Sequence, residues 1–287
     1  MFLRLSYFKT VAKSFLILYN WKVKFIKEML SMFAYPEFNE NGIKTLCEMG
    51  KIQPEMNMTI RIKRFRENET LTLEDDKCET AFLLLKGEAE ISWNCKTEKI
   101  KRANPFEKTP YCLHVPKNTA VSITAKEGTE ILIEQTDNDR YFEPVFYTPD
   151  DILYQEFGKG QWEGTGYRIC STVFDYDNAP YSNMVLGEVF NQPGRWSSYP
   201  PHHHPQPEVY YYQFDKPQGF GACFIGDNVF KSTEGSACFI TDGYDHQQVV
   251  APGYEMCYVW MIRHIDGDPW YKTTRFYAEE HKWLTEV

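Results

Sequence analysis

Short runs in which apolar and polar residues alternate fill most of the chain between Met58 and Tyr277. The first half contains MTIRIKRF, ETLTLE, TAFLLLKGEAEISWN and CLHVPKNTAVSITAKEGTEILIEQ, and the second contains RICSTVFDY, NMVLGEVF, EVYYYQF, GFGACFIG, SACFITDG and MCYVWMIRH. Gly, Asn, Asp or Lys clusters break the runs, a pattern typical of antiparallel strands in a sandwich or barrel. No long amphipathic helical stretch separates the halves, which disfavours a doubly wound α/β fold.

The two halves also repeat one local pattern. LLKGEAEISW followed by HVPKNTAVSI in the first half corresponds to QGFGACFI followed by ITDGYDHQQV in the second. Each is a glycine-containing β-run followed by a turn marked by Pro or Gly. The sequence therefore predicts an all-β chain of two antiparallel β-barrel (jelly-roll) units with short helical segments, over residues 33–150 and 151–287.

Three segments depart from the strand pattern. Residues 139–168 are rich in Pro, Gly and aromatic residues, so we expect a linker that packs on both halves. Within it, TPDDIL predicts a helical turn with Thr148 as cap and Pro149 at its first position. IKTLCEM, which follows the turn residues Glu40-Asn41-Gly42, predicts a short helix.

The N-terminal segment differs in charge from the rest of the chain. Its first 27 residues hold six basic residues and no acid, and the apolar piece SFLILYNW is short, with no cleavage site after it. A secretory signal fits poorly. We expect residues 1–32 to be an extension outside the fold; the alternative is a basic amphipathic surface helix.

Composition narrows the partners and the compartment. The formal net charge of -9 repels phosphate backbones, so nucleic acid is not an expected partner. Aromatic residues make up 16% of the chain, which favours strands. No apolar run approaches the ~20 residues of a membrane span. The eight cysteines include no CxxC pair, which predicts reduced, buried thiols in a cytoplasmic protein.

Three of the seven histidines are consecutive, in the segment SSYPPHHHPQPEVYYYQF. The flanking prolines predict a stiff, extended backbone, in which residues i and i+2 point the same way. His202 and His204 can therefore face one point, whereas His203 points away. Glu208 opens the next strand and can return to that point across the bend, which gives the pattern H-x-H-x3-E.

A fourth ligand is expected from a neighbouring strand. His246 follows the Gly243 turn and begins an apolar run, so antiparallel pairing would bring it beside the H-x-H pair. Imidazoles and a carboxylate suit one divalent metal ion, with zinc preferred and Fe, Mn, Co or Ni as alternatives. The competing interpretation is a surface histidine cluster without a fixed metal. Three isolated histidines are not expected to be ligands: His114, His264 and His281.

These two segments resemble the two cupin motifs, G(x)5HxH(x)3-4E(x)6G and G(x)5PxG(x)2H(x)3N. Thr241 stands where the motif has proline, Val250 where it has asparagine, and Trp196 where it has the first glycine. The N-terminal half has VPKN at residues 115–118 but no H-x-H. The resemblance therefore implies a bicupin whose first unit has lost its metal site.

The wider segment PGRWSSYPPHHH, together with VLGEVF and GTGYR, resembles the 5-deoxy-glucuronate isomerase family of bacterial myo-inositol catabolism. Arg168 in the GTG region, Arg275-Phe276 and the ending HKWL match that family over roughly residues 58–284. This chain has an added residue, Asp245, before His246. Asp245 is either a partner of a ligating imidazole or a surface turn residue.

The resemblance implies conversion of 5-deoxy-D-glucuronate to 5-dehydro-2-deoxy-D-gluconate through an enediol, with the metal as Lewis acid. It implies a small sugar acid as partner, and by analogy it is compatible with a homodimer. Arginines suit the substrate carboxylate, so Arg168 and Arg275 are candidates, with Tyr199 at the pocket mouth. The catalytic base stays open among a metal-bound water, Tyr199, one of Tyr210–Tyr212, and Glu188.

Two other functions remain compatible with the same ligand set. A metal-dependent dioxygenase uses a comparable site with iron, and a bicupin can bind a sugar acid without turning it over. A transcriptional regulator is disfavoured, because we find no helix-turn-helix segment and no basic stretch beyond residue 27.

Overall fold

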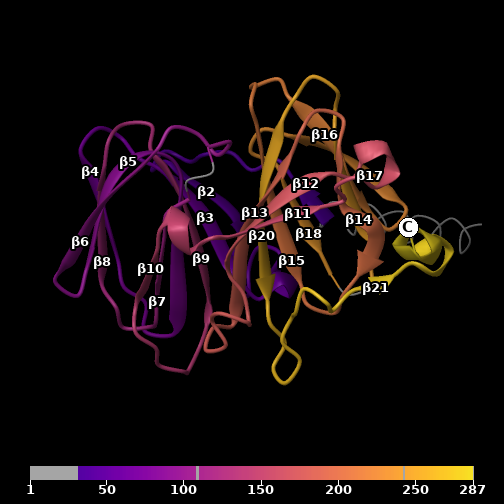
Figure 1. Cartoon of the computed structure of the whole chain (residues 1–287). Helices are drawn as coiled ribbons and strands as arrows, with labels where there is room; N and C mark the ends of the chain where they lie inside the picture. The colour runs from indigo at the N-terminus through magenta and orange to yellow at the C-terminus, as the bar shows by residue number, and fades with distance from the viewer. Residues whose placement is uncertain (1–31, 108–109, 242, 287) are drawn as a thin grey trace, which may run out of the picture.

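The structure is a computed structural model that describes residues 32–107, 110–241 and 243–286. The described strands form three antiparallel sheets in two units that lie side by side (Figure 1). The nine-stranded sheet of the N-terminal unit contains β2 (Ile43–Cys47), β3 (Thr59–Arg64), β4 (Glu69–Leu73), β5 (Cys78–Trp93), β6 (Lys96–Arg102), β7 (Cys112–Val115), β8 (Val121–Ala125), β9 (Glu130–Asp137) and β10 (Val145–Tyr147).

The C-terminal unit is built from two sheets. The seven-stranded sheet has the order β1 (Phe33–Ala34), β18 (Ala237–Ile240), β15 (Glu208–Phe214), β20 (Met256–Arg263), β13 (Met184–Asn191), β12 (Arg168–Phe174) and β11 (Leu153–Phe157). The five-stranded sheet has the order β17 (Asn228–Thr233), β16 (Phe220–Ile225), β19 (His246–Val250), β14 (Trp196–His203) and β21 (Phe276–Tyr277). The strands expected from the alternating runs are thus confirmed in both halves.

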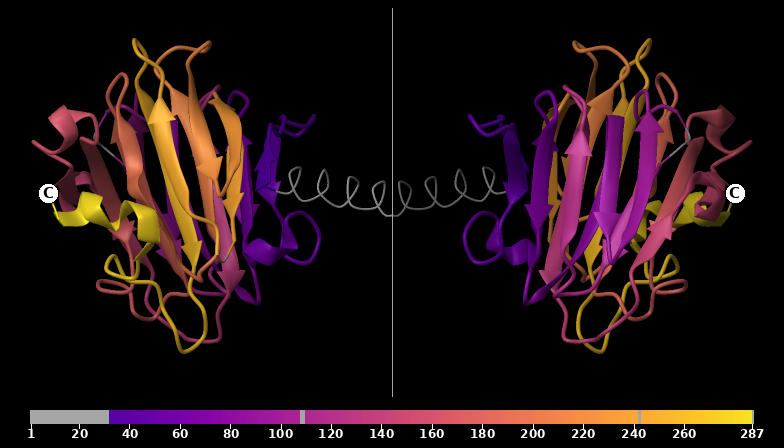
Figure 2. Two further views of the ribbon diagram at one scale, coloured as in Figure 1. Left: turned by 90° about the vertical axis from the view of Figure 1, so that its right-hand side faces the viewer. Right: turned by 90° about the vertical axis from the view of Figure 1, so that its left-hand side faces the viewer.

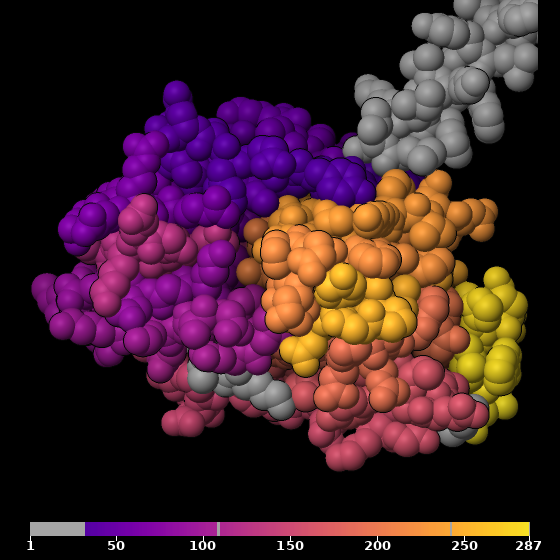
Figure 3. Space-filling view, turned by 90° about the horizontal axis from the view of Figure 1, so that it is seen from above, coloured from indigo at the N-terminus to yellow at the C-terminus, as the bar shows by residue number. Residues whose placement is uncertain are grey.

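The central strands of the seven-stranded sheet, β13, β15, β18 and β20, are buried on both faces, which explains their long apolar runs. On β15, Tyr210 and Tyr212 point into the core of the C-terminal unit, whereas Val209 and Tyr211 point into the core shared with the N-terminal unit. Views along the line that joins the two units show the strands face-on, with one unit in front of the other (Figure 2). Seen from above, the units abut, with η4 (Glu279–Glu286) at the outer edge of the second (Figure 3).

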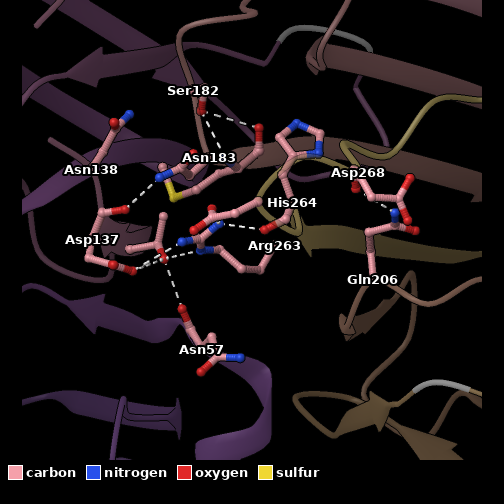
Figure 4. A network of polar contacts seen from close by, with 12 residues as sticks. Asn57, Asp137, Asn138, Ser182, Asn183, Gln206, Arg263, His264 and Asp268 are labelled. Atoms are coloured by element: carbon pink, nitrogen blue, oxygen red, sulfur yellow. Dashed lines mark hydrogen bonds and ion pairs between the residues drawn. The ribbon is translucent and has the colours of Figure 1, made fainter. Parts of the chain in front are cut away.

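Polar contacts also join the units at one end of the shared core (Figure 4). The Arg263 guanidinium at the end of β20 donates to Thr136 Oγ1 at 2.8 Å and contacts Asp137 Oδ1 at 3.2 Å. Asn183 Nδ2 donates to the Asp137 carbonyl at 2.8 Å. These bonds run from β9 of the first unit to the end of β20 and to Asn183, the residue before β13, so they tie the two sheets together at this end.

The helical turn expected at TPDDIL is confirmed, while the short helix at IKTLCEM is wrong. The first is η2 (Pro149–Asp151), in which Thr148 and Asp151 form a reciprocal capping box. The second is the strand β2, which pairs with β3 and in which Lys44 and Leu46 are buried. Sheet pairing therefore overrides the local helix signal. The other short helices are η1 (Pro54–Met56) and η3 (Trp162–Gly164).

The segment expected as a linker contains two strands that its composition concealed. Within residues 139–168, β10 pairs with β7 of the first unit and β11 pairs with β12 of the second. The segment thus joins both units, as expected, but it does so through sheet pairing. β1 also links the two units: it precedes the strands of the first unit in the chain but pairs with β18 of the second unit.

Most of the expected N-terminal extension, residues 1–31, lies outside the described residues. Its last residue, Met32, is buried, and Asn228 Nδ2 lies 3.7 Å from its sulfur. All eight cysteines are free thiols, six of them buried, as the sequence predicts. Among the residues that the structure covers, no helix combines the length and apolar character needed to cross a membrane.

One carboxyl group of the shared core lacks a partner. Glu134 on β9 is fully buried, and neither of its carboxyl oxygens has a hydrogen-bond partner among the described residues. Burial raises the pKa of Glu134 well above its usual value, and the charge of Glu79 raises it further. The folded protein therefore holds this proton at pH values where the unfolded chain has lost it.

Glu134→Gln is expected to stabilise the protein at neutral and higher pH. Because the pKa of Glu134 is raised in the folded protein, the stability that its protonation contributes is present in full below about pH 4.3. That stability is lost as the pH rises toward the folded-state pKa, by about 1.4 kcal/mol per pH unit. Gln is similar in shape and does not titrate, so its advantage should grow from pH 5 to pH 8. Urea unfolding at both values measures it, with exposed Glu127→Gln as control; parallel stabilities would contradict the prediction.

Candidate metal centre

Strands of both sheets carry the four predicted ligands to one end of the C-terminal barrel. β14 pairs antiparallel with β19, and His202 lies directly opposite His246, which is the strand pairing that the sequence predicts. His204 follows the end of β14, and Glu208 is the first residue of β15. All four side chains are buried.

Three of these residues form a compact group. One ligand atom each from His204, Glu208 and His246 lie within 4.8 Å of one another. Glu208 Oε2 is 3.2 Å from His204 Nε2 and 3.3 Å from His246 Nε2. His202 lies beside this group, with its ring centroid 4.7 Å from that of His246.

The hydrogen bond of Nδ1 determines the orientation and the tautomer of each imidazole ring. His202 Nδ1 donates to the Pro200 carbonyl at 2.8 Å, His204 Nδ1 to Gln206 at 2.9 Å, and His246 Nδ1 to Tyr244 at 3.3 Å. A carbonyl oxygen only accepts, so each Nδ1 carries the proton. In the neutral ring Nε2 then keeps its lone pair, which is the form that ligates a metal ion.

The donor set fits a divalent cation. His246 Nε2 is buried, and its nearest polar neighbour among the described residues is Glu208 Oε2 at 3.3 Å. Burial by itself raises the pKa of Glu208, but hydrogen bonds and charge from His204 and His246 lower it to about 2. The Glu208 carboxylate is thus ionised, and a negative charge beside imidazole nitrogens is the donor set that a divalent cation prefers.

His203 lies apart from this group. Its Nδ1 is 2.8 Å from Asp245 Oδ1, and its ring stacks on Phe276 at 5.7 Å. The added residue Asp245 therefore partners the one histidine of the triplet that faces away from the other three.

A pocket opens from the histidines, and its wall is cationic. Arg168, Lys272 and Arg275 all line it, together with His202, His204, Glu208 and His246. Arg168 donates to the carbonyls of Gly166 and Tyr199, both at 3.0 Å, which fixes its guanidinium. Burial lowers the pKa of Arg168 to about 10; the charge of Tyr258 opposes this shift and that of Arg275 adds to it, and Arg168 remains charged at neutral pH.

Hydroxyl groups form a second feature of the pocket. Ser198 Oγ lies 2.9 Å from Tyr210 Oη and 3.3 Å from Tyr258 Oη, and all three residues line the pocket. Burial, followed by the charge of Glu208, raises the pKa of Tyr210 well above its usual value. Tyr210 is therefore a neutral phenol that can donate a hydrogen bond at the metal-ligand end.

The structure places the other candidates outside this pocket. The Tyr199 ring packs against Trp162 and Trp196 in a separate hollow. Tyr211 lies in the core shared with the N-terminal unit, and the Tyr212 hydroxyl donates to Gln248 at 2.6 Å. Glu188 forms a bidentate ion pair with Arg102 of the N-terminal unit, at 2.7 and 2.9 Å.

Several pocket residues escaped the sequence analysis: Tyr258, Trp260, Trp270 and Lys272. Tyr258 and Trp260 alternate on β20 in register with Tyr212 and Tyr210 of β15, so strand alternation could have indicated them. Trp270, Lys272 and Arg275 come from residues 264–275, which we name the C-terminal strap. No periodic pattern marks the strap.

Comparisons with known proteins agree with this description. The KduI/IolB family model matches residues 35–284. The 5-deoxy-glucuronate isomerase of Geobacillus kaustophilus is 27% identical over 239 residues, covering 77% of this chain and 83% of that protein. An IolB-like protein from Salmonella typhimurium superposes with a TM-score of 0.79 at 19% identity over 88% of this chain and 99% of that chain.

A solved structure with a different chemistry shares the fold. The formate complex of Lactobacillus farciminis oxalate decarboxylase superposes with a TM-score of 0.62 at 13% identity, over 89% of this chain and 90% of that chain. At sequence identities this low, the structural similarity is evidence of the fold alone. They confirm the expected all-β bicupin architecture.

Proposed function

The chain belongs to the KduI/IolB family, and on that premise we propose that it is an isomerase converting 5-deoxy-D-glucuronate to 5-dehydro-2-deoxy-D-gluconate in myo-inositol catabolism. The composition of one pocket carries the proposal: metal-ligand side chains at one end and three cationic side chains in its wall. An aldehyde acid matches this pocket: its carbonyl and neighbouring hydroxyl suit the metal-ligand end, and the carboxylate at its other end suits the cationic wall. The free thiols fit a cytoplasmic location.

His202, His204, Glu208 and His246 would hold the divalent ion, which we propose to be zinc. Bound there, the ion supplies a Lewis acid toward the carbonyl and the neighbouring hydroxyl of the substrate. The pocket lies beside the ligand atoms, so the reacting carbons of a bound sugar acid would lie at that end.

The cationic wall would orient the acid. Arg168 is held by two carbonyls, and Lys272 is held by Asp175 at 2.8 Å, so both present fixed charge to the pocket. Arg275 has a buried Nε with no partner among the described residues. A guanidinium offers a fork of donors to a carboxylate, which makes Arg275 the side chain we assign to it.

The hydroxyl cluster would handle the proton that moves between oxygens. Isomerisation transfers a proton from C2 to C1 and another from the C2 hydroxyl to the C1 oxygen. Tyr210 Oη is protonated and hydrogen-bonded to Ser198 Oγ, which also reaches Tyr258 Oη. Tyr210 can therefore donate to the developing hydroxyl and recover a proton through Ser198.

One experiment tests the proposal directly. Purified protein is analysed for bound metal and incubated with 5-deoxy-D-glucuronate, and the keto acid is followed by NMR. We expect about one metal ion per chain and conversion without oxygen uptake. Oxygen consumption would instead indicate a dioxygenase, and saturable binding without conversion in fully metallated protein would indicate a sugar-acid-binding protein.

Arg275→Ala is expected to raise KM for the sugar acid by about 10- to 100-fold, because hydrogen bonds to a charged group contribute about 1.5–3 kcal/mol. Metal content should stay near that of the wild type, since Arg275 does not ligate. Steady-state kinetics and metal analysis check both values. The exposed Arg66→Ala in the N-terminal unit is the control, and an unchanged KM would refute the role.

A further inference from the structure

Two indole groups of the pocket lack hydrogen-bond acceptors. Trp260 on β20 and Trp270 on the C-terminal strap both line the pocket and are 5% and 3% exposed. Neither Nε1–H has an acceptor among the described residues, and the same holds for Arg275 Nε. Indole and guanidinium groups only donate, so all three need an oxygen from elsewhere.

Unpartnered buried donors are rare, because losing hydration without gaining an acceptor is unfavourable. Here three of them line one pocket beside the ligand cluster. Packing alone does not explain two tryptophans at these positions, since a phenylalanine could fill much of the space without a donor. A ligand rich in oxygen atoms would satisfy all three groups.

Neighbouring residues position both tryptophans. Trp260 packs against Gly187 of β13, where an added Cβ would come within 2.5 Å of Cε2 of the indole. Trp270 N donates to His264 Nδ1 at 2.9 Å. Burial, followed by the charge of Arg263, lowers the pKa of His264 to about 4, so this nitrogen keeps its lone pair.

The strap is also tied to the loop that carries a metal-ligand candidate. Gln206 accepts from His204 Nδ1 through its carbonyl, and its side-chain amide donates to the Asp268 carbonyl at 2.8 Å (Figure 4). The Trp270 ring centroid lies 6.2 Å from His204 and 5.5 Å from Trp260. The two indoles therefore keep a fixed place next to the ligand cluster.

We propose that the indole N–H groups of Trp260 and Trp270 are specificity-determining donors that bind the hydroxyl or carboxylate oxygens of a polyhydroxy acid. This inference rests on the proposed function, since it names how the same pocket selects its ligand. Arg168, Lys272 and Arg275 provide the positive charge that such an anion needs, while the indoles select for oxygen atoms along the chain of carbons.

The test distinguishes the effect of the indole N–H donor from that of the shape of the ring. Trp270 is replaced by β-(3-benzothienyl)alanine, which keeps the bicyclic shape and substitutes sulfur for the N–H, and by phenylalanine. Trp260 is treated in the same way, and the exposed Trp283 serves as control. Binding of D-gluconate, an open-chain acid that cannot isomerise, is measured by calorimetry on metal-loaded protein, with metal content and thermal melting recorded for each variant.

We expect the isostere at either position to weaken gluconate binding about tenfold, equivalent to about 1.4 kcal/mol, with melting and metal content unchanged. The Trp283 isostere should bind as the wild type does. Full affinity in both pocket isosteres would overturn the inference, and if the phenylalanine variants alone were weaker, the indoles would be space-filling only.

The outcomes also distinguish this inference from the proposed function. Donor-dependent gluconate binding without turnover of 5-deoxy-D-glucuronate would leave the indole assignment standing and remove the isomerase. Turnover of 5-deoxy-D-glucuronate with KM unchanged in both isosteres would support the isomerase and overturn the indole assignment. Failure of the metal-loaded protein to bind any sugar acid would overturn both.

Discussion

Replacing His204 with glutamine is expected to abolish stoichiometric metal binding and to lower turnover of 5-deoxy-D-glucuronate by about 10³-fold or more. The imidazole provides one of the three ligand atoms that lie within 4.8 Å of one another. Glutamine cannot replace its Nε2 lone pair. Loss of a Lewis acid worth several kcal/mol of transition-state stabilisation corresponds to a rate loss of this size.

The neighbouring histidine provides a matched control. His203→Gln changes the same residue type one position away, where the imidazole contacts Asp245 and Phe276 and lies apart from the cluster. We expect it to keep wild-type metal content and turnover. Elemental analysis after zinc reconstitution, with circular dichroism to verify folding, checks both variants. Equal metal loss in the two would mean that the triplet binds ions non-specifically.

Much of this cluster was predictable because short-range geometry decides it. Alternation along an extended chain separates His202 and His204 from His203, and the turn at Gly243 predicts that His246 returns beside them. The structure places His202 directly opposite His246. The tighter group omits His202, a distinction that spacing does not contain, because ring orientation is set by the carbonyls that accept from each Nδ1.

The pocket wall was less predictable, since its residues reach the site through tertiary contacts. Trp270, Lys272 and Arg275 lie on a strap without periodicity, held by Asp175, His264 and Gln206. Tyr199 illustrates the converse case. It lies close to the ligands in sequence, but its ring points into a different hollow, while its carbonyl accepts from Arg168.

The fold shows the same division between local and long-range information. Alternating runs predicted the strands of both barrels, and Thr148 with Pro149 predicted η2. β2 and β11 were missed because their pairing partners, β3 and β12, determine their conformation more than their own composition does. The pairing of Glu188 with Arg102 was also not predictable, because it depends on packing between the two units, which no single segment of sequence encodes.

Glu188 was a candidate base from sequence, and the structure gives it a different role. Its carboxylate and the Arg102 guanidinium are both fully buried and joined by two hydrogen bonds, and Arg102 also donates to the carbonyls of Leu84 and Pro105. This pair connects β13 of one unit to the end of β6 of the other. Removal of one partner would leave a buried, uncompensated charge.

Glu188→Gln is therefore expected to lower the free energy of unfolding by about 3–5 kcal/mol, while turnover of the protein that remains folded changes little. Urea unfolding and kinetics at low temperature measure the two effects separately. Glu156→Gln, which removes a surface pair with Lys159, should cost less than about 1 kcal/mol. The double variant Arg102→Met/Glu188→Leu should be more stable than Glu188→Gln, because no buried charge is left unpaired. Unchanged stability with turnover reduced 100-fold would instead identify Glu188 as the base.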